Sequence, residues 1–401
     1  MRSGGFDGAV VAVNPAFGVP SLDRPCDLAL ISVPAAAVPG AVADAARADC
    51  KAAIVLSSGF GETGAEGRQV EEGLRQTALA AGMRLVGPNC MGVVSRYRDG
   101  WLNGSYFWQL PERAGRLSMI SQSGAFGGMF FAEARRRNLG IARFLSVGNS
   151  ADVTLTEVLE YLGGDAETGV IGIFAEAFPD GRGFVEIARQ VTPAKPVVVL
   201  KAGKGIRGAA AAASHTGSLA GRHAAAQAAF RRAGVVEAED TDAFFDALTV
   251  LAAGRKAGSR IAILTISGGP GVLASDRAER AGLELPPPGA ATVDTLRRLA
   301  PSFAALGNPI DLTPQCPPPN FREAVAAVFA DAAYDGVVVI NCGLDIPEFG
   351  EGVASGARMT GKPVTAYLLE TPRIEAALRD AEIPLLDTPE RAVGAYAALT
   401  R

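Results

Sequence analysis

Short apolar runs rich in β-branched residues alternate along the chain with Ala-, Arg- and Glu-rich segments of helical periodicity. Each apolar run ends in Gly, Ser, Pro or Asn, and most of them lead into a helical segment. This alternation is typical of βαβ units built around parallel sheets. It predicts an α/β protein with strands at Ala9–Val13, Leu28–Val33, Ala53–Ser57, Leu117–Ser121, Val170–Phe174, Val197–Leu200, Ile261–Ile266 and Val337–Ile340.

The chain repeats part of its own pattern. The segment Arg116–Gly124, an apolar run that ends in Ser-Gly, resembles Arg260–Gly268. Further along, Thr192–Leu200 resembles Thr360–Tyr367, and a run that begins Gly-Val precedes each of them. Two flavodoxin-like domains in tandem explain these correspondences. With boundaries in the polar or Gly-bearing segments 111–114 and 253–259, the expected domains cover residues 1–112, 113–255 and 256–401.

The first expected domain has the pattern of part of a Rossmann-type sheet. Such a domain normally begins with a strand and a glycine-rich turn, about 30 residues of βαβ before the second strand. Here Val11–Pro15 follows the start almost at once. We therefore expect an N-terminally truncated Rossmann-type domain, with its first βα unit missing, followed by two flavodoxin-like parallel-sheet domains.

Composition narrows the class of protein. Of the 401 residues, 48% are hydrophobic and 20% charged, as in globular proteins with large cores. The net charge of −4 and the absence of a basic stripe argue against a nucleic-acid surface. The five cysteines have no paired spacing, which excludes a zinc ribbon and favours reduced, mostly buried thiols over a disulfide framework. Because no apolar run reaches the roughly 18 residues of a membrane span and the start lacks a signal-peptide core, we expect a cytoplasmic protein, with no metal site.

Only the first repeat carries residues suited to chemistry. After its strand at 197–200 it has a long Gly- and Ala-rich insertion that contains His215, whereas the second repeat leads quickly into a helix. The first repeat also has Glu176 in the region where the second has Cys342-Gly343. We therefore expect function in the first repeat, and a scaffold or docking role for the second.

His215 is a candidate nucleophile, because neutral imidazole is competent near pH 7 and the small neighbouring residues allow close approach. A nucleophilic histidine needs a partner on its other ring nitrogen, and Glu176, at the end of a neighbouring strand, could be that partner. The alternatives are a solvated loop histidine, which is our interpretation of His223, and a surface carboxylate at Glu176.

A candidate anion site lies at Ser121-Gln122-Ser123-Gly124-Ala125, which closes a strand and opens a helix. Its backbone N–H groups and helix dipole suit phosphate, although an ordinary N-cap explains the same residues, since the second repeat has Ser267-Gly268 there.

Segments of the first domain also follow expected strands, at the edge where parallel sheets bind ligands. Turn chemistry alone would select the same residue types. These segments are Asn14-Pro15, Val33-Pro34, Ser57-Ser58-Gly59-Phe60 and Gly87-Pro88-Asn89-Cys90.

With these segments in hand, the sequence resembles the α-type subunits of ADP-forming acyl-CoA synthetases, relatives of succinyl-CoA synthetase. The resemblance extends over nearly the whole chain, and its most specific parts are the histidine and Gly-Pro-Asn-Cys segments. It implies a CoA-binding domain followed by two flavodoxin-like ligase domains, and a reaction that interconverts acyl-CoA, phosphate and ADP with the free acid, CoA and ATP. Besides the segments already named, it rests on Ser146–Asn149, Ser214–Gly221 and Asn308–Leu312.

The resemblance also implies roles for the matched residues. An acyl phosphate formed on the chain would phosphorylate His215, and Glu176 would orient the imidazole. The expected phosphate-binding residues are Ser121, Ser123, Gly124, Ala125 and Gly217. The expected CoA-binding residues are Asn14, Pro15, Pro34, Ser58, Gly59, Phe60 and Asn89.

The family's nucleotide site is an ATP-grasp module, and nothing in this sequence resembles one. We therefore expect ATP or ADP and Mg²⁺ to act through a separate ATP-grasp β-type subunit in a hetero-oligomer, with acetate or another short acid as the default substrate. Because the usual first strand and turn are missing, either the start is misassigned or CoA binding is impaired. The alternatives are a non-catalytic or regulatory protein that binds CoA or acyl-CoA, and a flavin or nicotinamide oxidoreductase, which lacks support because no intact G-x-G-x-x-G follows a first strand.

Overall fold

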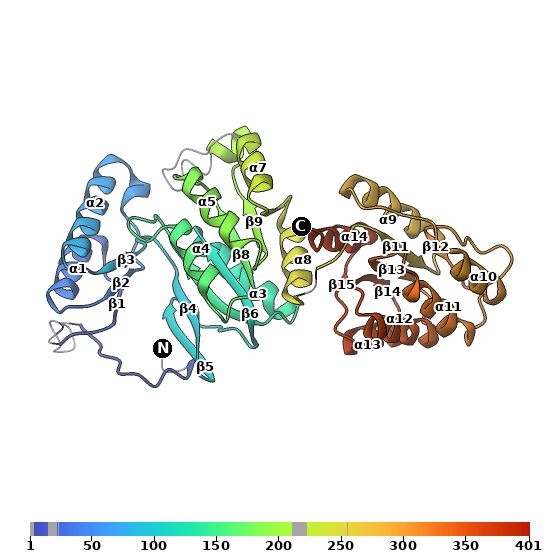
Figure 1. The fold of residues 1–401 in the computed structure, drawn as a ribbon. Coiled ribbons are helices and arrows are strands. Elements are labelled where there is room, and N and C mark those ends of the chain that lie inside the picture. The colour runs from blue at the N-terminus through green and yellow to red at the C-terminus, as the bar shows by residue number, and fades with distance from the viewer. Residues whose placement is uncertain (1–3, 15–21, 23, 211–222, 255) are drawn as a thin grey trace. The chain divides into compact units, whose positions relative to one another are not determined.

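The computed structural model of the chain describes residues 4–14, 22, 24–210, 223–254 and 256–401. The chain forms two compact units, Met1–Asp240 and Thr241–Arg401. The first unit holds a three-stranded and a seven-stranded sheet, and the second holds a five-stranded sheet (Figure 1). The expected α/β architecture of parallel-sheet domains is confirmed.

The three-stranded sheet is parallel and runs in the order β1 (Leu28–Ile31), β2 (Ala52–Val55) and β3 (Arg84–Val86). Because side chains alternate between the faces of a sheet, its strands can contribute to two cores. One face packs on α1 (Val38–Arg47) and α2 (Ala65–Ala80), with Ala53, Val55 and Leu85 in this core. Single turns of 3-10 helix lie at Ala35–Ala37 and Gly61–Thr63.

The predicted strand at Ala9–Val13 is wrong. These residues form no strand in the part of the chain that the structure describes, and all five are exposed. Val11 and Val13, for example, are 46% and 45% exposed. An apolar run becomes a strand only where a neighbouring strand pairs with it and a core covers it. The other seven predicted strands are confirmed within a few residues at their ends.

The expectation of reduced cysteines is wrong for Cys26 and Cys50, which form a disulfide. The parallel register explains the pairing, because Leu28 lies beside Ala52 and the two cysteines precede these residues by the same number of positions. Their Cα atoms are 4.8 Å apart. The other cysteines are free thiols: Cys90 and Cys316 are buried and Cys342 is partly exposed.

The seven-stranded sheet runs in the order β10-β9-β8-β6-β7-β4-β5. Its first five members are parallel, and the hairpin of β4 and β5 adds two antiparallel strands at the β7 edge. The hairpin thus ties the N-terminal segment to the sheet that follows it. The strands are β4 Gly92–Tyr97, β5 Gly100–Ser105, β6 Ala114–Ser121, β7 Ile141–Ser146, β8 Val170–Ala175, β9 Val197–Lys201 and β10 Val236–Ala238. The described helices are α3 Gly124–Arg136, α4 Leu155–Gly164, α5 Gly181–Val191 and α7 His223–Arg232.

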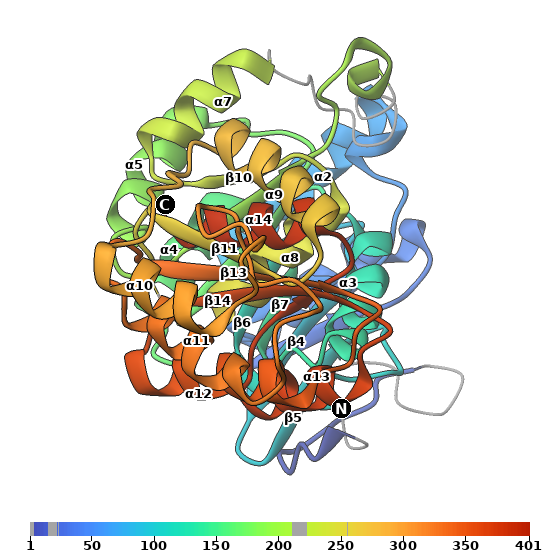
Figure 2. The ribbon, with the colours of Figure 1, turned by 90° about the vertical axis from the view of Figure 1, so that its right-hand side faces the viewer.

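The second unit is built on a five-stranded parallel sheet in the order β12-β11-β13-β14-β15. Figures 1 and 2 show α9 and α14 on one face of this sheet and α11 and α12 on the other. The strands are β11 Ile261–Thr265, β12 Ile310–Asp311, β13 Gly336–Cys342, β14 Val364–Leu369 and β15 Leu385–Leu386. The helices are α8 Thr241–Ala252, α9 Gly268–Ala281, α10 Ala290–Leu299, α11 Asn320–Ala330, α12 Pro347–Thr360, α13 Pro372–Asp380 and α14 Pro389–Ala398.

The two larger sheets confirm the flavodoxin-like repeat. If the strands of each repeat are numbered along the chain, the parallel strands follow the order 2-1-3-4-5 in both. The registers also correspond, because Ser118 pairs with Ile171 as Ala262 pairs with Val337. Both repeats pass from the first strand through a Ser-Gly pair into a helix, α3 or α9. These parallel strands are buried on both faces, which is why they read as unbroken apolar runs.

The helix α8 belongs to the second compact unit. It packs on α14, where Arg391 donates to both carboxylate oxygens of Asp246 at 2.7 Å. In chain order α8 follows β10 as α14 follows β15, so the final helices of the two repeats pack on each other. The three-domain division at 112 and 255 stays a prediction, with α8 as the last helix of the first repeat.

Among the described helices, none has both the length and the apolar character that crossing a bilayer requires.

Candidate active site

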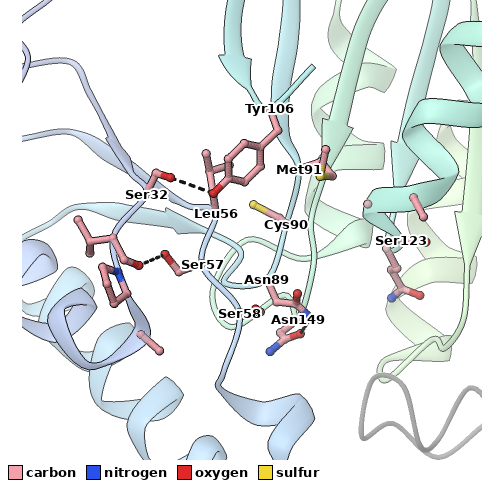
Figure 3. A pocket seen from close by; sticks show the side chains of 16 residues that line it. Ser32, Leu56, Ser57, Ser58, Asn89, Cys90, Met91, Tyr106, Ser123 and Asn149 are labelled. Atoms are coloured by element: carbon pink, nitrogen blue, oxygen red, sulfur yellow. Dashed lines mark hydrogen bonds between the residues drawn. The ribbon is translucent and has the colours of Figure 1, made fainter. Parts of the chain in front are cut away.

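A cavity of about 640 Å³ lies in the first unit, where strand ends of its two sheets meet (Figure 3). The segments after β1, β2 and β3 supply one wall, and the segment after β6 supplies another. This is the carboxyl edge of each sheet, where parallel α/β folds bind ligands. The cavity is lined by Ser32, Val33, Pro34, Ala35, Leu56, Ser57, Ser58, Asn89, Cys90, Met91, Tyr106, Gln122, Ser123, Gly124, Ala125 and Asn149.

Asn149, in the loop after β7, holds the two sheets together at the cavity. Its side chain donates to the carboxylates of Glu62 and Glu71, at 2.6 and 2.7 Å, and accepts from the Asn89 amide at 3.2 Å. Burial alone would raise the pKa of Glu62, but the hydrogen bonds from Asn149 and from the Gly59 backbone outweigh it and lower that pKa. Glu62 is therefore ionised at neutral pH and accepts these bonds as a carboxylate.

Two further hydrogen bonds fix the wall formed by the smaller sheet, and Figure 3 marks both. The Ser57 hydroxyl donates to the Val33 carbonyl at 2.5 Å, which joins the ends of β1 and β2. The hydroxyls of Ser32 and Tyr106 are 2.9 Å apart, so the residue after β5 reaches the end of β1. The cavity therefore has a hydrogen-bonded rim contributed by three separate segments.

The helix α3 begins at the cavity. The Ser121 hydroxyl donates to the Ser123 carbonyl at 2.7 Å and accepts from the Ser123 N–H at 3.1 Å, which shapes the turn between strand and helix. Ser123 is the N-cap and its hydroxyl accepts from the Phe126 N–H at 3.4 Å. A Cβ at Gly124 would lie 2.5 Å from Cγ of Met91, so a larger residue here would require the Met91 side chain to move. The exposed N–H groups and the helix dipole make this turn suited to an anion.

Glu176 directly follows β8 and is 7% exposed. The side-chain amide of Gln122 accepts from the Glu176 and Ala177 N–H groups, at 2.6 and 3.0 Å, and donates to the Ala177 carbonyl at 3.0 Å. Lys201, at the end of β9, donates to the Glu176 carbonyl at 2.7 Å. Burial lowers the pKa of Lys201, and the carboxylates of Glu176 and Glu237 oppose that shift.

Three families of protein domain match the chain in succession. A CoA binding domain matches residues 6–96, a succinyl-CoA ligase-like flavodoxin domain matches residues 114–251, and a ligase-CoA domain matches residues 261–343. This is the order expected from the sequence.

Relatives match the chain over nearly its whole length. The α subunits of two ADP-forming acetate–CoA ligases of Pyrococcus furiosus, II and I, are 34% and 37% identical to the chain over 94% and 93% of its length, and it spans 83% and 82% of theirs. The chain belongs to the α-type ADP-forming acyl-CoA synthetases. An acetyl-coenzyme A synthetase of Ca. Korarchaeum cryptofilum, solved with phosphate and ADP, matches it with a TM-score of 0.86 at 34% identity, over 95% of this chain and 84% of that one.

Some acyl-CoA synthetases of this family are longer. The ADP-forming acetate–CoA ligase I of Archaeoglobus fulgidus is 37% identical over 99% of this chain, which spans only 59% of that protein. Membership of the family confirms the expected acid–CoA ligase and favours catalysis over the non-catalytic alternative.

The structure brings half of the expected ligand-binding residues to one cavity. Pro34, Ser58, Asn89, Ser123, Gly124 and Ala125 line it. Ser121 lies behind the wall, fully buried, and shapes the turn.

The other expected residues either lie away from the cavity or fall outside the residues that the structure describes. Phe60 is buried in the core against α1 and α2, Gly59 donates its N–H to Glu62, and Asn14 is exposed and not part of the cavity lining. Glu176 does not line the cavity but contacts Gln122, which does. The expected residues Pro15, His215 and Gly217 lie outside the described residues.

Sequence reasoning gave no role to Ser32, Tyr106 or Gln122. Gln122 had a usable signal, because a long amide between two serines at a strand end can reach the next strand. Tyr106 had none, because only the pairing of the hairpin with β7 brings the residue after β5 to the cavity. Among the described residues, no three His, Cys, Asp or Glu side chains come together in a way that could hold a metal ion.

Proposed function

We propose that the chain is the α-type subunit of an ADP-forming acid–CoA ligase, which interconverts acyl-CoA, phosphate and ADP with the free acid, CoA and ATP. The observation that carries this function is the single cavity shared by strand ends of the CoA-binding sheet and the N-terminus of α3. A thioester held by the first and a phosphate held by the second would lie next to each other. Positioning and charge stabilisation supply most of the catalysis in such transfers.

The reaction proceeds in three transfers. An oxygen of phosphate attacks the thioester carbonyl carbon, the C–S bond breaks, and the thiolate takes up a proton as CoA leaves. A ring nitrogen of His215 then attacks the phosphorus of the acyl phosphate, the P–O bond to the acyl group breaks, and the acid leaves as a carboxylate. ADP finally attacks the phosphohistidine, which returns the imidazole and gives ATP.

Within the first unit, we assign roles to residues around the cavity. The helix start at Ser123, Gly124 and Ala125 holds the phosphoryl group through the N–H groups of Gly124 and Ala125. Ser121 shapes this turn by accepting from the Ser123 N–H, and Gly217 supplies a further contact. Pro34, Ser58 and Asn89 hold CoA. Glu176 orients the imidazole of His215 and stabilises its cationic form, as a carboxylate does in a hydrolase triad. Acetate or another short acid is the expected acyl donor or product, in keeping with the names of the Pyrococcus relatives.

The nucleotide half of the reaction is assigned to a second chain. The Pyrococcus relatives are named as α subunits, which supports a hetero-oligomer. We propose that the partner is an ATP-grasp β-type subunit that binds ATP or ADP with Mg²⁺, and that the complex works in the cytoplasm.

Phosphorylation from labelled ATP tests this function. The chain and its ATP-grasp partner are incubated with radiolabelled ATP and Mg²⁺, and the chain is expected to acquire an acid-labile, base-stable label. His215→Ala should abolish the label. His223→Ala is the matched control and should keep it, because His223, at the start of α7, has its Nδ1 3.6 Å from the Glu237 carboxylate on β10 and does not line the cavity. A chain that stays unlabelled beside an active partner would leave a non-catalytic CoA-binding protein as the better interpretation.

A further inference from the structure

The backbone of Glu176 and Ala177 is held by two side chains from neighbouring strands. The Gln122 side chain accepts hydrogen bonds from both N–H groups and donates one to the Ala177 carbonyl. The Lys201 ammonium donates to the Glu176 carbonyl. Lys201 also donates to the Ala202 carbonyl, and only 4% of its surface is exposed. Each polar backbone atom of the two residues therefore has a side-chain partner, and the direction in which the Glu176 side chain leaves the strand is fixed from two sides.

The second repeat gives an internal comparison for this arrangement. Its strands have the same registers, with Ile171 beside Val197 in the first repeat and Val337 beside Val364 in the second. Counting from these pairs, Glu176 corresponds to Cys342, Lys201 to Leu368, and, from the paired first strands, Gln122 to Ile266. The three polar residues of the first repeat are thus all replaced by less polar ones in the second.

The surrounding turn is kept in both repeats. Thr265 donates to the Ser267 carbonyl at 3.0 Å and accepts from the Ser267 N–H at 2.8 Å, as Ser121 does with Ser123. In the second repeat the Ser267 hydroxyl accepts from the Cys342 N–H at 3.1 Å, so one short side chain suffices to hold that strand end. The fold alone therefore does not require a glutamine and a buried lysine at these positions.

We infer that Gln122 and Lys201 are positioning residues that hold the Glu176 carboxylate in place for the phosphohistidine step. This role rests on the proposed function of Glu176. Gln122 also lines the cavity, so the same amide connects the wall of the ligand site with the strand end that carries Glu176. A carboxylate that acts by orienting an imidazole must be held to within a fraction of an ångström, and a misplacement of about 1 Å can cost roughly a hundredfold in rate.

The test measures how fast the full chain is phosphorylated. The chain in complex with its ATP-grasp partner, without nucleotide, is mixed with acetyl-CoA and radiolabelled phosphate, and the label is followed by rapid quench. Gln122→Leu and Lys201→Met keep most of the side-chain volume and remove the hydrogen bonds. Each is expected to lower the maximal labelling rate about tenfold or more and to leave the KM for phosphate within about twofold, because the α3 turn keeps its own N–H groups.

A double-mutant cycle separates positioning from a general loss of stability. If the two residues act through Glu176, either substitution made in a Glu176→Gln chain should lower the remaining rate by less than about twofold. A full tenfold loss in that background, or no loss in the wild-type background, would overturn the inference. Ser267→Ala is the matched control, since it removes the corresponding backbone contact of the second repeat and should leave the labelling rate unchanged.

The same experiment distinguishes an error in the proposed function from an error in the positioning roles. If the wild-type complex takes up no label, or if Glu176→Gln labels as fast as the wild type, the proposed roles of the chain or of Glu176 are themselves wrong. If Glu176→Gln is slow while Gln122→Leu and Lys201→Met label normally, only the positioning roles fail.

Discussion

The two flavodoxin-like repeats have the same strand order and the same turn into the first helix, yet they differ at the carboxyl edge of the sheet. The first repeat places Gln122, Glu176 and Lys201 there, and the second places Ile266, Cys342 and Leu368 at the corresponding positions. The hydroxyl that shapes the turn is kept in both repeats, as Ser121 or Thr265. The comparison teaches that the strand order and the turn belong to the fold, whereas the three residues for which we propose a role in the phosphohistidine step are specific to the strand ends of the first repeat.

The two units also differ in where an ion pair with little exposed side-chain surface is placed. In the first unit Arg143 on β7 binds Asp165, at the end of α4, through two hydrogen bonds of 2.8 and 2.9 Å. In the second unit Arg391 on α14 binds Asp246 on α8. The first pair ties a strand to the connection that follows a helix, and the second ties two helices together. The two ion pairs therefore stabilise different contacts, a strand with the end of a helix in the first unit and two helices in the second.

The largest expected effect concerns the difference at the strand ends. Glu176→Gln should lower the rate of phosphohistidine formation by about a hundredfold or more, because the amide cannot stabilise the imidazolium as a carboxylate does. Cys342→Ser, at the corresponding position, should leave the rate within about twofold. Burial raises the pKa of the Cys342 thiol, so it stays protonated at neutral pH and cannot stand in for a carboxylate. Rapid-quench labelling of both variants checks this, and equal losses in the two would show that the repeats share the function.

The next effect concerns the second unit alone. Asp246→Ala should lower its free energy of unfolding by about 3 kcal/mol, since it leaves the mostly buried Arg391 without its strongest partner. Asp242→Ala is the control. Asp242 is 63% exposed and lies 3.4 Å from the same guanidinium, so its loss should cost no more than about 0.5 kcal/mol. Hydrogen exchange followed by mass spectrometry can measure both changes in peptides of α8 and α14. Equal losses of unfolding free energy in the two variants would mean that burial of the carboxylate does not determine how much each ion pair stabilises the unit.

A pH-dependent effect of intermediate size is expected in the first unit. The hydrogen bonds from Arg143 outweigh burial and lower the pKa of Asp165 to about 2. A carboxyl whose folded pKa is depressed contributes stability that is complete above its unfolded pKa of about 3.9 and is lost as the pH falls through the folded value. Asp165→Asn should therefore cost about 2 kcal/mol at pH 7 and remove the part of the stability loss that falls between about pH 4 and 2.

Tryptophan fluorescence measures this change without interference from the second unit. Both tryptophans of the chain, Trp101 and Trp108, belong to the first unit. Urea unfolding at a series of pH values would then give the stability of that unit in each variant. A wild-type curve between pH 4 and 2 that matches the curve of Asp165→Asn would show that the ion pair contributes nothing there.

The sequence predicted which segments form strands better than it predicted which segments pair with one another. The parallel strands were predictable because burial on both faces produces apolar runs such as Val197–Leu200 and Val337–Ile340, and because the repeat shows three of the strand segments in both copies. Ala9–Val13 is also an apolar run, but no strand of the described part of the chain pairs with it. The Cys26–Cys50 disulfide depends on the register of β1 and β2, which a scan for closely spaced cysteines does not consider.

The candidate site was predictable as far as it depends on strand ends. Ser58 and Asn89 follow strands of the smaller sheet and Ser123 follows a strand of the larger one, and the cavity lies where these strand ends meet. Tyr106 and Gln122 depend on how separate elements approach each other. Side chains that act across such an approach leave no periodic signal in the chain, because their partners are distant in sequence.

The smallest expected effect separates a helix cap from a ligand contact. Ser123 caps α3 and lines the cavity, whereas Ser267 makes no side-chain cap on α9 and instead binds the Cys342 N–H. Ser123→Ala should cost at most about 1 kcal/mol of stability, since the Ser123 to Phe126 bond is long at 3.4 Å, and Ser267→Ala should cost a similar amount. Only Ser123→Ala should also raise the KM for phosphate, by about threefold to tenfold, because it disturbs the turn that faces the cavity. Steady-state kinetics with phosphate as the varied substrate checks this, and a KM that rises equally in Ser267→Ala would show that the effect comes from general loosening and not from the first repeat's anion site.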